Sequence, residues 1–205
     1  MRAVVATLIV LVLAGCGASG EEDPPAGDAA ATTTAAPAQE FNQQLHDELV
    51  AMLEEDQAER IEGAIGDDRA RTERLKEIVA EHGWPTISLV GEDGEDAAWA
   101  IAQHADHDPE FQEQALELIR EAVARGDASP GNLAYLTDRV AVGKGEPQTY
   151  GTQVGCTADG EVQVAPLADE DSVDERRAEV GLGPLDDYLA EMARICAQDA
   201  GTSSP

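Results

Sequence analysis

The chain has 205 residues and carries 42 Asp and Glu residues against 13 Lys and Arg, for a formal net charge of −29. This acidity argues against nucleic acid and anionic membrane surfaces as partners, because both are bound through cations that face phosphate. An acidic surface also serves solubility alone, so it identifies no partner by itself.

The first sixteen residues have the features of a bacterial lipoprotein signal peptide. A short basic start precedes an apolar run over residues 3–13, which is too short to span a bilayer. The following Leu13-Ala-Gly-Cys16 resembles the lipobox, in which the cysteine receives a diacylglycerol and becomes the mature N-terminus. We therefore expect residues 1–16 to be a signal peptide and Cys16 to anchor an extracytoplasmic protein to the cell membrane. An ordinary cleaved secretory signal is the alternative.

Residues 17–40 are rich in Ala, Thr, Pro and acidic residues, and have no periodic apolar pattern. Such a composition buries too little apolar surface to offset the entropy of ordering, which predicts a disordered tether. We expect a single folded domain over residues 41–200, which is an ordinary length for one domain, and a disordered tail over 201–205.

Helical spacing of apolar residues dominates the first part of this domain. It predicts an amphipathic helix over about 41–65, with Phe41, Leu45, Leu49 and Ile61 among its inward residues. Asp67 or Asp68 is expected to cap a second helix that stops at Gly83. The following segments are a short apolar run over 87–90, a Gly-Glu-Asp-Gly turn, and a third helix capped by Asp93.

The rest of the chain has two Pro-containing helix start signals, followed by a change from helical to strand periodicity. Asp108-Pro109 and Ser129-Pro130 each predict an N-cap followed by proline at the first helical position. Segments 148–156 and 161–167 flank a Thr-Ala-Asp-Gly turn and predict a β-hairpin. A capping box at Ser172–Glu175 and a helix start at Gly183-Pro184 complete the chain. The predicted fold is mainly α, a multi-helix domain with one β-hairpin near the C-terminal third.

Two cysteines remain once Cys16 is lipidated. Cys156 ends the first strand of the predicted hairpin, and Cys196 lies on the apolar face of the last predicted helix. In an oxidising compartment an even pair predicts a Cys156–Cys196 disulfide. Two separately buried thiols are the alternative.

The histidines near residue 105 invite comparison with a metal site. On a helix, His104 would share one face with His107 at i+3 and with Asp108 at i+4, and zinc would need one more donor. No histidine follows His107, and we predict no metal and no cofactor. The interpretation that we favour is that His104 forms a hydrogen bond inside the domain while His107 faces solvent.

Two further segments carry polar residues between apolar ones. Asp138 and Arg139 are adjacent on a predicted helix and cannot point the same way, so one of them is expected to pair with another element. Arg139 suits bidentate binding of a carboxylate, or an internal salt bridge. Residues 148–153 are polar for a strand, and Gly151 would let a backbone or a ligand approach closely. This segment predicts a lined pocket, or else an exposed edge strand.

Considered together, seven short segments resemble the bacterial family called domain of unknown function 6624. They are Met52–Arg60, His82–Pro85, Gln103–Asp106, Leu136–Arg139, Gln148–Gln153, Arg176-Arg177 and Gly183–Leu185. The resemblance covers about residues 41–188 and implies no reaction. It draws attention to nine polar residues: Asp56, Gln57, Arg60, His104, Asp138, Arg139, Gln148, Tyr150 and Gln153.

Two functions follow from these residues. In the first, which the sequence favours, the domain binds a small anionic ligand or an envelope protein through a polar cleft. Arg60 or Arg139 would hold the anionic group, and the other binding candidates, which would add polar contacts, are Gln57, Gln148, Tyr150 and Gln153.

The alternative is a metal-independent hydrolase. His104 would be the base that activates water, Asp56 or Asp138 would orient it or act as the acid, and Arg139 would stabilise developing negative charge. A carboxylate within hydrogen-bond reach of a perturbed His104 would favour the enzyme, whereas an open groove without such a pair would favour binding.

Overall fold

The computed structural model describes residues 40–61 and 66–202. The predicted signal peptide with Cys16 and the predicted tether as far as residue 39 lie outside the described residues. The described part contains seven helices and one antiparallel pair of strands, which confirms the predicted fold class. The elements are α1 (Gln43–Ile61), α2 (Asp68–His82), α3 (Ile87–Gln103), α4 (Pro109–Ala124), α5 (Pro130–Gly143), β1 (Val154–Cys156), β2 (Val162–Val164), α6 (Val173–Glu179) and α7 (Leu185–Thr202).

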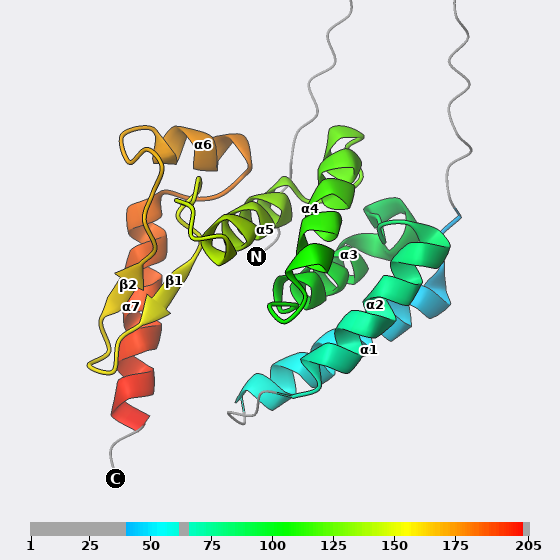
Figure 1. Cartoon of the computed structure of the whole chain (residues 1–205), viewed down its shortest axis with the longest axis horizontal. Helices are drawn as coiled ribbons and strands as arrows, with labels where there is room; N and C mark the ends of the chain where they lie inside the picture. Colours follow the sequence, from blue (N-terminus) through cyan, green and yellow to red (C-terminus); the bar gives the residue numbers. More distant parts are fainter. Residues whose placement is uncertain (1–39, 62–65, 203–205) are drawn as a thin grey trace, which may run out of the picture. The chain divides into compact units, whose positions relative to one another are not determined.

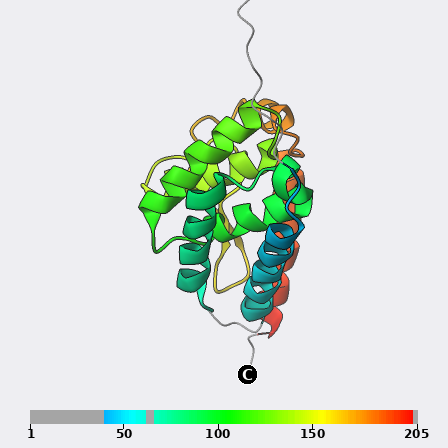
Figure 2. The same cartoon turned by 90° about the vertical axis from the view of Figure 1, so that its right-hand side faces the viewer.

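Helix α3 is the central element of the helical part, because it packs against α1, α2, α4 and α5 (Figure 1). Figure 2 views the same helices from the side of α1 and α2. Each of the five helices contributes side chains that are almost fully buried, among them Leu49, Leu75, Ile101, Ile119 and Leu136. Burial of one such side chain contributes roughly 1.5 to 3 kcal/mol, so this core holds the helices in place around α3.

The predicted helix starts are confirmed at three positions. The side chain of Asp67 accepts from the backbone N–H of Ala70 at the start of α2. Asp108 and Ser129 cap α4 and α5 in the same way, each followed by proline at the first helical position. These caps satisfy N–H groups that have no partner inside the helix.

The capping box predicted at Ser172 is wrong. Ser172 occupies the N-cap position of α6, but its side chain makes no capping bond. Its hydroxyl instead donates to the carboxylate of Asp169, 2.5 Å away, and accepts from Arg176. Asp169 and Arg176 therefore compete with the N-terminal N–H groups of α6 for the Ser172 hydroxyl.

Helix α1 differs from its predicted amphipathic pattern. Phe41 is 47% exposed and Ile61 is 87% exposed, although both were predicted to face inward. The buried stripe that begins with Leu45 and Leu49 continues instead to Asp56, which is 1% exposed. A carboxylate thus occupies the place where the pattern predicts an apolar side chain.

Helix α3 begins at Ile87, six residues before the predicted cap at Asp93. The apolar run 87–90 is its first turn, and the helix is interrupted at Gly91, where φ is +80°. A positive φ is available to glycine at little cost, which is why the chain can bend here and continue as a helix.

The strands are shorter than predicted. Val154 pairs with Val164 and Cys156 with Val162, whereas residues 148–153 form no ladder with β2. Gln148 forms an isolated parallel bridge with Leu167, beyond the end of β2. The N–H groups of Thr149, Tyr150 and Thr152 donate to Asp138, as described below. The glycine in this segment, Gly151, has φ +71°, and a Cβ there would lie 2.8 Å from Leu185, so the close neighbour is α7 rather than a ligand.

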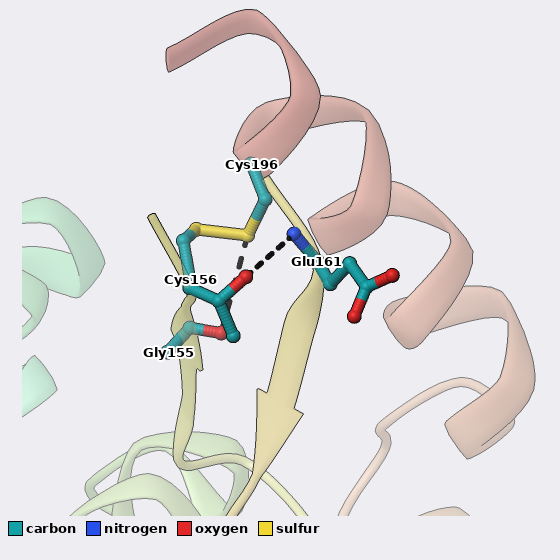
Figure 3. Close-up of a disulfide and its surroundings, with 5 residues drawn as sticks. Gly155, Cys156, Glu161 and Cys196 are labelled. Carbon is teal, nitrogen blue, oxygen red and sulfur yellow. Dashed lines mark hydrogen bonds between the residues drawn. A yellow bond between two sulfur atoms is a disulfide. The ribbon is translucent and has the colours of Figure 1, made fainter. Parts of the chain in front are cut away.

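The predicted disulfide is confirmed. Cys156 at the end of β1 is bonded to Cys196 of α7, with 5.3 Å between the Cα atoms and 40 residues of sequence separation (Figure 3). The bond joins the hairpin to the last helix, which also packs against β2.

We predict that the Cys156→Ser, Cys196→Ser double variant loses about 3 to 4 kcal/mol of unfolding free energy, because a closed loop of this length restricts the unfolded chain. Urea unfolding of the oxidised protein and of the variant measures the difference. Wild-type protein with reductant should match the variant, and a difference below about 1 kcal/mol would show that α7 is held by packing alone.

A buried carboxyl group links α3 to α5. Glu95 is 1% exposed and accepts from the Trp84 indole at 3.3 Å and from the Asn132 amide at 2.9 Å. Burial outweighs these hydrogen bonds and raises the pKa of Glu95 from its ordinary 4.5 to about 7. The folded protein therefore holds this proton over a pH range in which the unfolded chain has lost it.

We predict that Glu95 makes the folded state less stable as pH rises from about 4.5 to 7, by about 3 kcal/mol in total. Below pH 4.5 both states bind the proton, so this contribution to stability is fully present there. Carboxylates whose pKa is lowered make the folded state more stable as pH rises, so the effect of Glu95 must be isolated by comparison with the Glu95→Gln variant. The unfolding free energy of this variant should rise relative to that of wild type over this pH range. A pH-independent difference in unfolding free energy between the two proteins would contradict the prediction.

Candidate functional site

A cleft of about 390 Å³ opens where the last turn of α1 meets the start of α2 and the turn between α3 and α4. Arg60 comes from α1, and Arg139 comes from α5. The complete lining is Arg60, Gly66, Asp68, Arg69, His104, Asp106, His107 and Arg139.

The imidazole of His104 forms a hydrogen bond with the buried Asp56. Its Nδ1 lies 3.1 Å from the Asp56 carboxylate. Since an ionised carboxylate can only accept, Nδ1 must carry the hydrogen, and this bonding fixes the tautomer. The His104 side chain is 23% exposed, and its Nε2 bonds to no residue within ranges 40–61 and 66–202. The atom that is left to accept a proton is therefore Nε2.

The pKa values of Asp56 and His104 are both lowered, which keeps the carboxylate ionised and the imidazole neutral at neutral pH. Burial would raise the pKa of Asp56, but the Arg60 guanidinium and the His104 imidazole together outweigh it and hold the pKa below the ordinary value. Burial also lowers the pKa of His104 below 6.5; the Asp56 carboxylate opposes this effect without overcoming it. At neutral pH the pair is an ionised carboxylate beside a neutral imidazole.

Further polar contacts fix Asp56 from the remaining directions. Arg60 donates from Nε at 3.1 Å and from Nη2 at 3.1 Å, and the Gln57 amide donates at 2.8 Å. The Arg71 guanidinium lies 3.6 Å away and also contacts Asp68. These side chains join α1 to α2 and compensate the charge of a carboxylate that has almost no access to water.

Three of the thirteen Lys and Arg residues line this one cleft, in a chain with a net charge of −29. Arg60 and Arg139 are bonded to aspartates, Arg60 to Asp68 at 3.0 Å and Arg139 to Asp106 at 2.9 Å through Nε. The Nη1 group of Arg60 donates to no residue in the described part of the chain. The lining carries three guanidinium groups and two carboxylates, and the buried Asp56 bonded to Arg60 balances the third charge, so the cleft offers an anionic group guanidinium N–H donors rather than a net positive charge.

His104 forms a hydrogen bond inside the domain, as predicted, but the predicted shared helix face and the solvent-facing His107 are wrong. Helix α3 ends at Gln103, and His104 is its C-cap, so His104 and His107 do not share a helix face. His107 is half-buried rather than solvent-facing, and its Nε2 is a buried atom without a partner among the described residues. Within residues 40–61 and 66–202 no group of three or more His, Cys, Asp or Glu side chains is placed to hold a metal ion.

Asp138 is not a partner of His104. It is fully buried, and its carboxylate accepts from the backbone N–H groups of Thr149 at 2.7 Å, Tyr150 at 3.1 Å and Thr152 at 3.0 Å. The hydroxyl of Thr152 donates a fourth bond at 2.9 Å. Asp138 therefore organises the loop that the sequence predicts as a strand, and Asp56 is the carboxylate that orients His104.

The other candidates from residues 148–153 have internal partners too. Gln148 is fully buried and bonds to backbone groups of Gln153 and Ala165. Within the described part of the chain, Tyr150 forms its hydrogen bonds through the backbone N–H and carbonyl groups. The side-chain oxygen of Gln153 accepts from Arg139 at 3.2 Å, so this residue positions a cleft arginine without lining the cleft.

The structure thus brings Asp56, Arg60, His104 and Arg139 to one place, and Gln57 beside them. Sequence reasoning missed the cleft residue Arg69, which carries no local signal because an exposed arginine in the first turn of a helix resembles any solvated residue. Asp106 stands in the family pattern and could have been found there as the partner of Arg139.

The fold and the site define a mainly α domain with a disulfide-linked hairpin and a His–Asp pair in an arginine-lined cleft. The chain belongs to a family of unknown function, DUF6624, whose model matches residues 34–197. No curated protein and no solved structure matches the chain. Among the helices that the structure describes, none has both the length and the apolar character needed to cross a membrane.

We predict that Asp138→Asn costs about 2 to 4 kcal/mol of unfolding free energy, because an amide would present donors to the N–H groups that the carboxylate now satisfies. Urea unfolding measures this cost. The control is Asp159→Asn, an exposed change in the hairpin turn that should stay within about 0.5 kcal/mol of wild type. Equal stability of the two variants would show that loop 149–152 does not depend on Asp138.

Proposed function

We propose that the protein is a metal-independent hydrolase that acts on a small anionic substrate in the His104 cleft. The observation that carries this proposal is the contact of 3.1 Å between His104 Nδ1 and the buried Asp56 carboxylate. Although the sequence alone favours a binding module, this contact is the feature that distinguishes the enzyme from it.

In the proposed reaction His104 Nε2 removes a proton from a water molecule as that water attacks the substrate. The resulting imidazolium is stabilised by Asp56, which also keeps the ring in the correct tautomer. The leaving group then receives the proton from Nε2, which restores the neutral imidazole. The guanidinium groups that line the cleft stabilise the negative charge that develops on the substrate.

A second candidate function is binding of an anionic ligand without turnover. It is supported by the arginines of the cleft, Arg60, Arg69 and Arg139, in a chain that is otherwise strongly acidic. Binding and hydrolysis use the same cleft, and they differ in whether His104 takes part in chemistry.

We also propose that this site lies outside the cytoplasm, on a protein held to the cell membrane by a lipid on Cys16. The lipobox-like sequence supports the anchor, and the Cys156–Cys196 bond is of a kind that persists in oxidising compartments. An envelope protein is the alternative partner for the cleft.

We predict that His104→Asn lowers kcat/KM for anionic esters by about 10²- to 10⁴-fold, because general-base catalysis contributes this much. The assay uses the full chain in detergent with p-nitrophenyl phosphate, bis(p-nitrophenyl) phosphate and p-nitrophenyl hemisuccinate, and with p-nitrophenyl acetate as the neutral comparison. Wild-type kcat/KM should rise with pH through a pKa below 6.5 and then level off, because only the neutral imidazole accepts a proton.

His82→Asn is the matched control, because His82 is similarly exposed, at 29%, and does not line the cleft. It should keep wild-type activity. Failure of the wild-type chain to hydrolyse any of these esters, or full activity of His104→Asn, would overturn the hydrolase proposal. Binding of inorganic phosphate in calorimetry would then leave the binding function in its place.

A further inference from the structure

A second cavity, of about 450 Å³, shares the His104 side chain with the cleft. Its other lining residues come from three helices: Leu53 and Gln57 from α1, Asp96, Trp99, Ala100 and Gln103 from α3, and Asn132 from α5. The cleft shares α1 and α5 with this cavity. We refer to it as the Trp99 pocket.

The two cavities follow one another along these helices. On α1, Gln57 lines the Trp99 pocket and Arg60, at i+3, lines the cleft. On α5, Asn132 lines the pocket and Arg139, at i+7, lines the cleft, so both pairs lie on one helix face. Because His104 lines both, the pocket and the cleft are adjacent cavities.

The chemistry of the Trp99 pocket differs from that of the arginine-lined cleft. It contains no lysine or arginine, and its polar groups are three amides, one carboxylate and His104. Asn132 is nine-tenths buried and donates to both Glu95, at 2.9 Å, and Asp96, at 2.7 Å, and its side-chain oxygen accepts no hydrogen bond from residues 40–61 or 66–202. Gln57 donates to Asp56, and its side-chain oxygen likewise accepts none from these residues.

The indole of Trp99 is held edge-on against Tyr135, with 5.7 Å between ring centroids, and is therefore a fixed apolar surface.

Resting on the proposed function, we propose that the Trp99 pocket is a sugar subsite, and that the substrate is a sugar that carries a phosphate or carboxylate group. Hydroxyl groups both donate and accept, which suits a wall of amides and a carboxylate. The C–H face of a sugar ring packs on an aromatic side chain such as Trp99. The acidic group would lie against Arg60, Arg69 and Arg139, and His104 would stand between the two parts of the substrate.

Calorimetry on the full chain in detergent tests this assignment with glucose 6-phosphate, glucuronate, glucose, inorganic phosphate and acetate. We expect at least one of the two sugar acids to bind tenfold or more tightly than glucose and than the matching free anion. Comparison of glucose 6-phosphate with glucuronate then distinguishes phosphate from carboxylate as the acidic group.

Two variants locate the sugar in the pocket. Trp99→Ala and Gln57→Ala should each reduce the affinity for the preferred sugar acid, Trp99→Ala by tenfold or more, towards the affinity of the free anion. Gln44→Ala is the matched control for Gln57→Ala, because both glutamines are exposed on α1 and Gln44 lines neither cavity. Gln57→Ala changes an exposed side chain, so it remains informative if Trp99→Ala does not fold.

Sugar acids that bind no more tightly than the free anions, or a sugar preference that survives both variants, would overturn the sugar subsite. If His104-dependent ester hydrolysis and phosphate binding persist in that case, the proposed function stands without it. Absence of both anion binding and ester hydrolysis would instead overturn the proposed function.

Discussion

The buried carboxylate of Asp56 is the constraint on which the candidate site depends. A carboxylate with 1% exposure is stable in the ionised form only if cations and hydrogen-bond donors replace the water it has lost. Arg60 and Gln57 from α1, Arg71 from α2 and His104 after α3 supply them, so three segments must meet at this point. The hydrogen bond to Asp56 orients His104, burial keeps its imidazole neutral, and its side chain stays partly open to the cleft.

A second buried carboxylate has the corresponding role on the other side of α5. Asp138 gathers the N–H groups of the 149–152 loop, while Arg176 and Arg177 bind the carbonyl oxygens of Thr149 and Tyr150 at 2.9 and 2.8 Å. The family-pattern segments Gln148–Gln153 and Arg176-Arg177, which lie away from the cleft, therefore have a structural role. They hold α5, and with it Arg139, in position.

Aromatic contacts continue this support across the domain. Tyr135 of α5 lies edge-on both to Trp99 of α3 and to Tyr188 of α7, at 5.7 and 6.3 Å between centroids, and the Tyr188 hydroxyl donates to the carbonyl of Thr152. With the disulfide at Cys196, α7 is joined to the rest of the domain at both its ends. The cleft and the Trp99 pocket are therefore lined by helices that are packed against one another, which favours precise placement of a catalytic group.

The sequence by itself determined the features that depend on near neighbours: the mainly α class, the start signals at Asp67, Asp108 and Ser129, and the presence of a hairpin in the C-terminal third. The disulfide was also predictable, because the expected lipidation of Cys16 leaves two cysteines and the expected oxidising compartment favours their pairing. Tertiary structure alone decided that Asp56 rather than Asp138 meets His104, since 48 residues separate that pair and periodicity along α1 predicts an apolar side chain where the carboxylate lies. It also decided that residues 149–152 form a loop, because a buried carboxylate on another helix binds the N–H groups that a strand would have used.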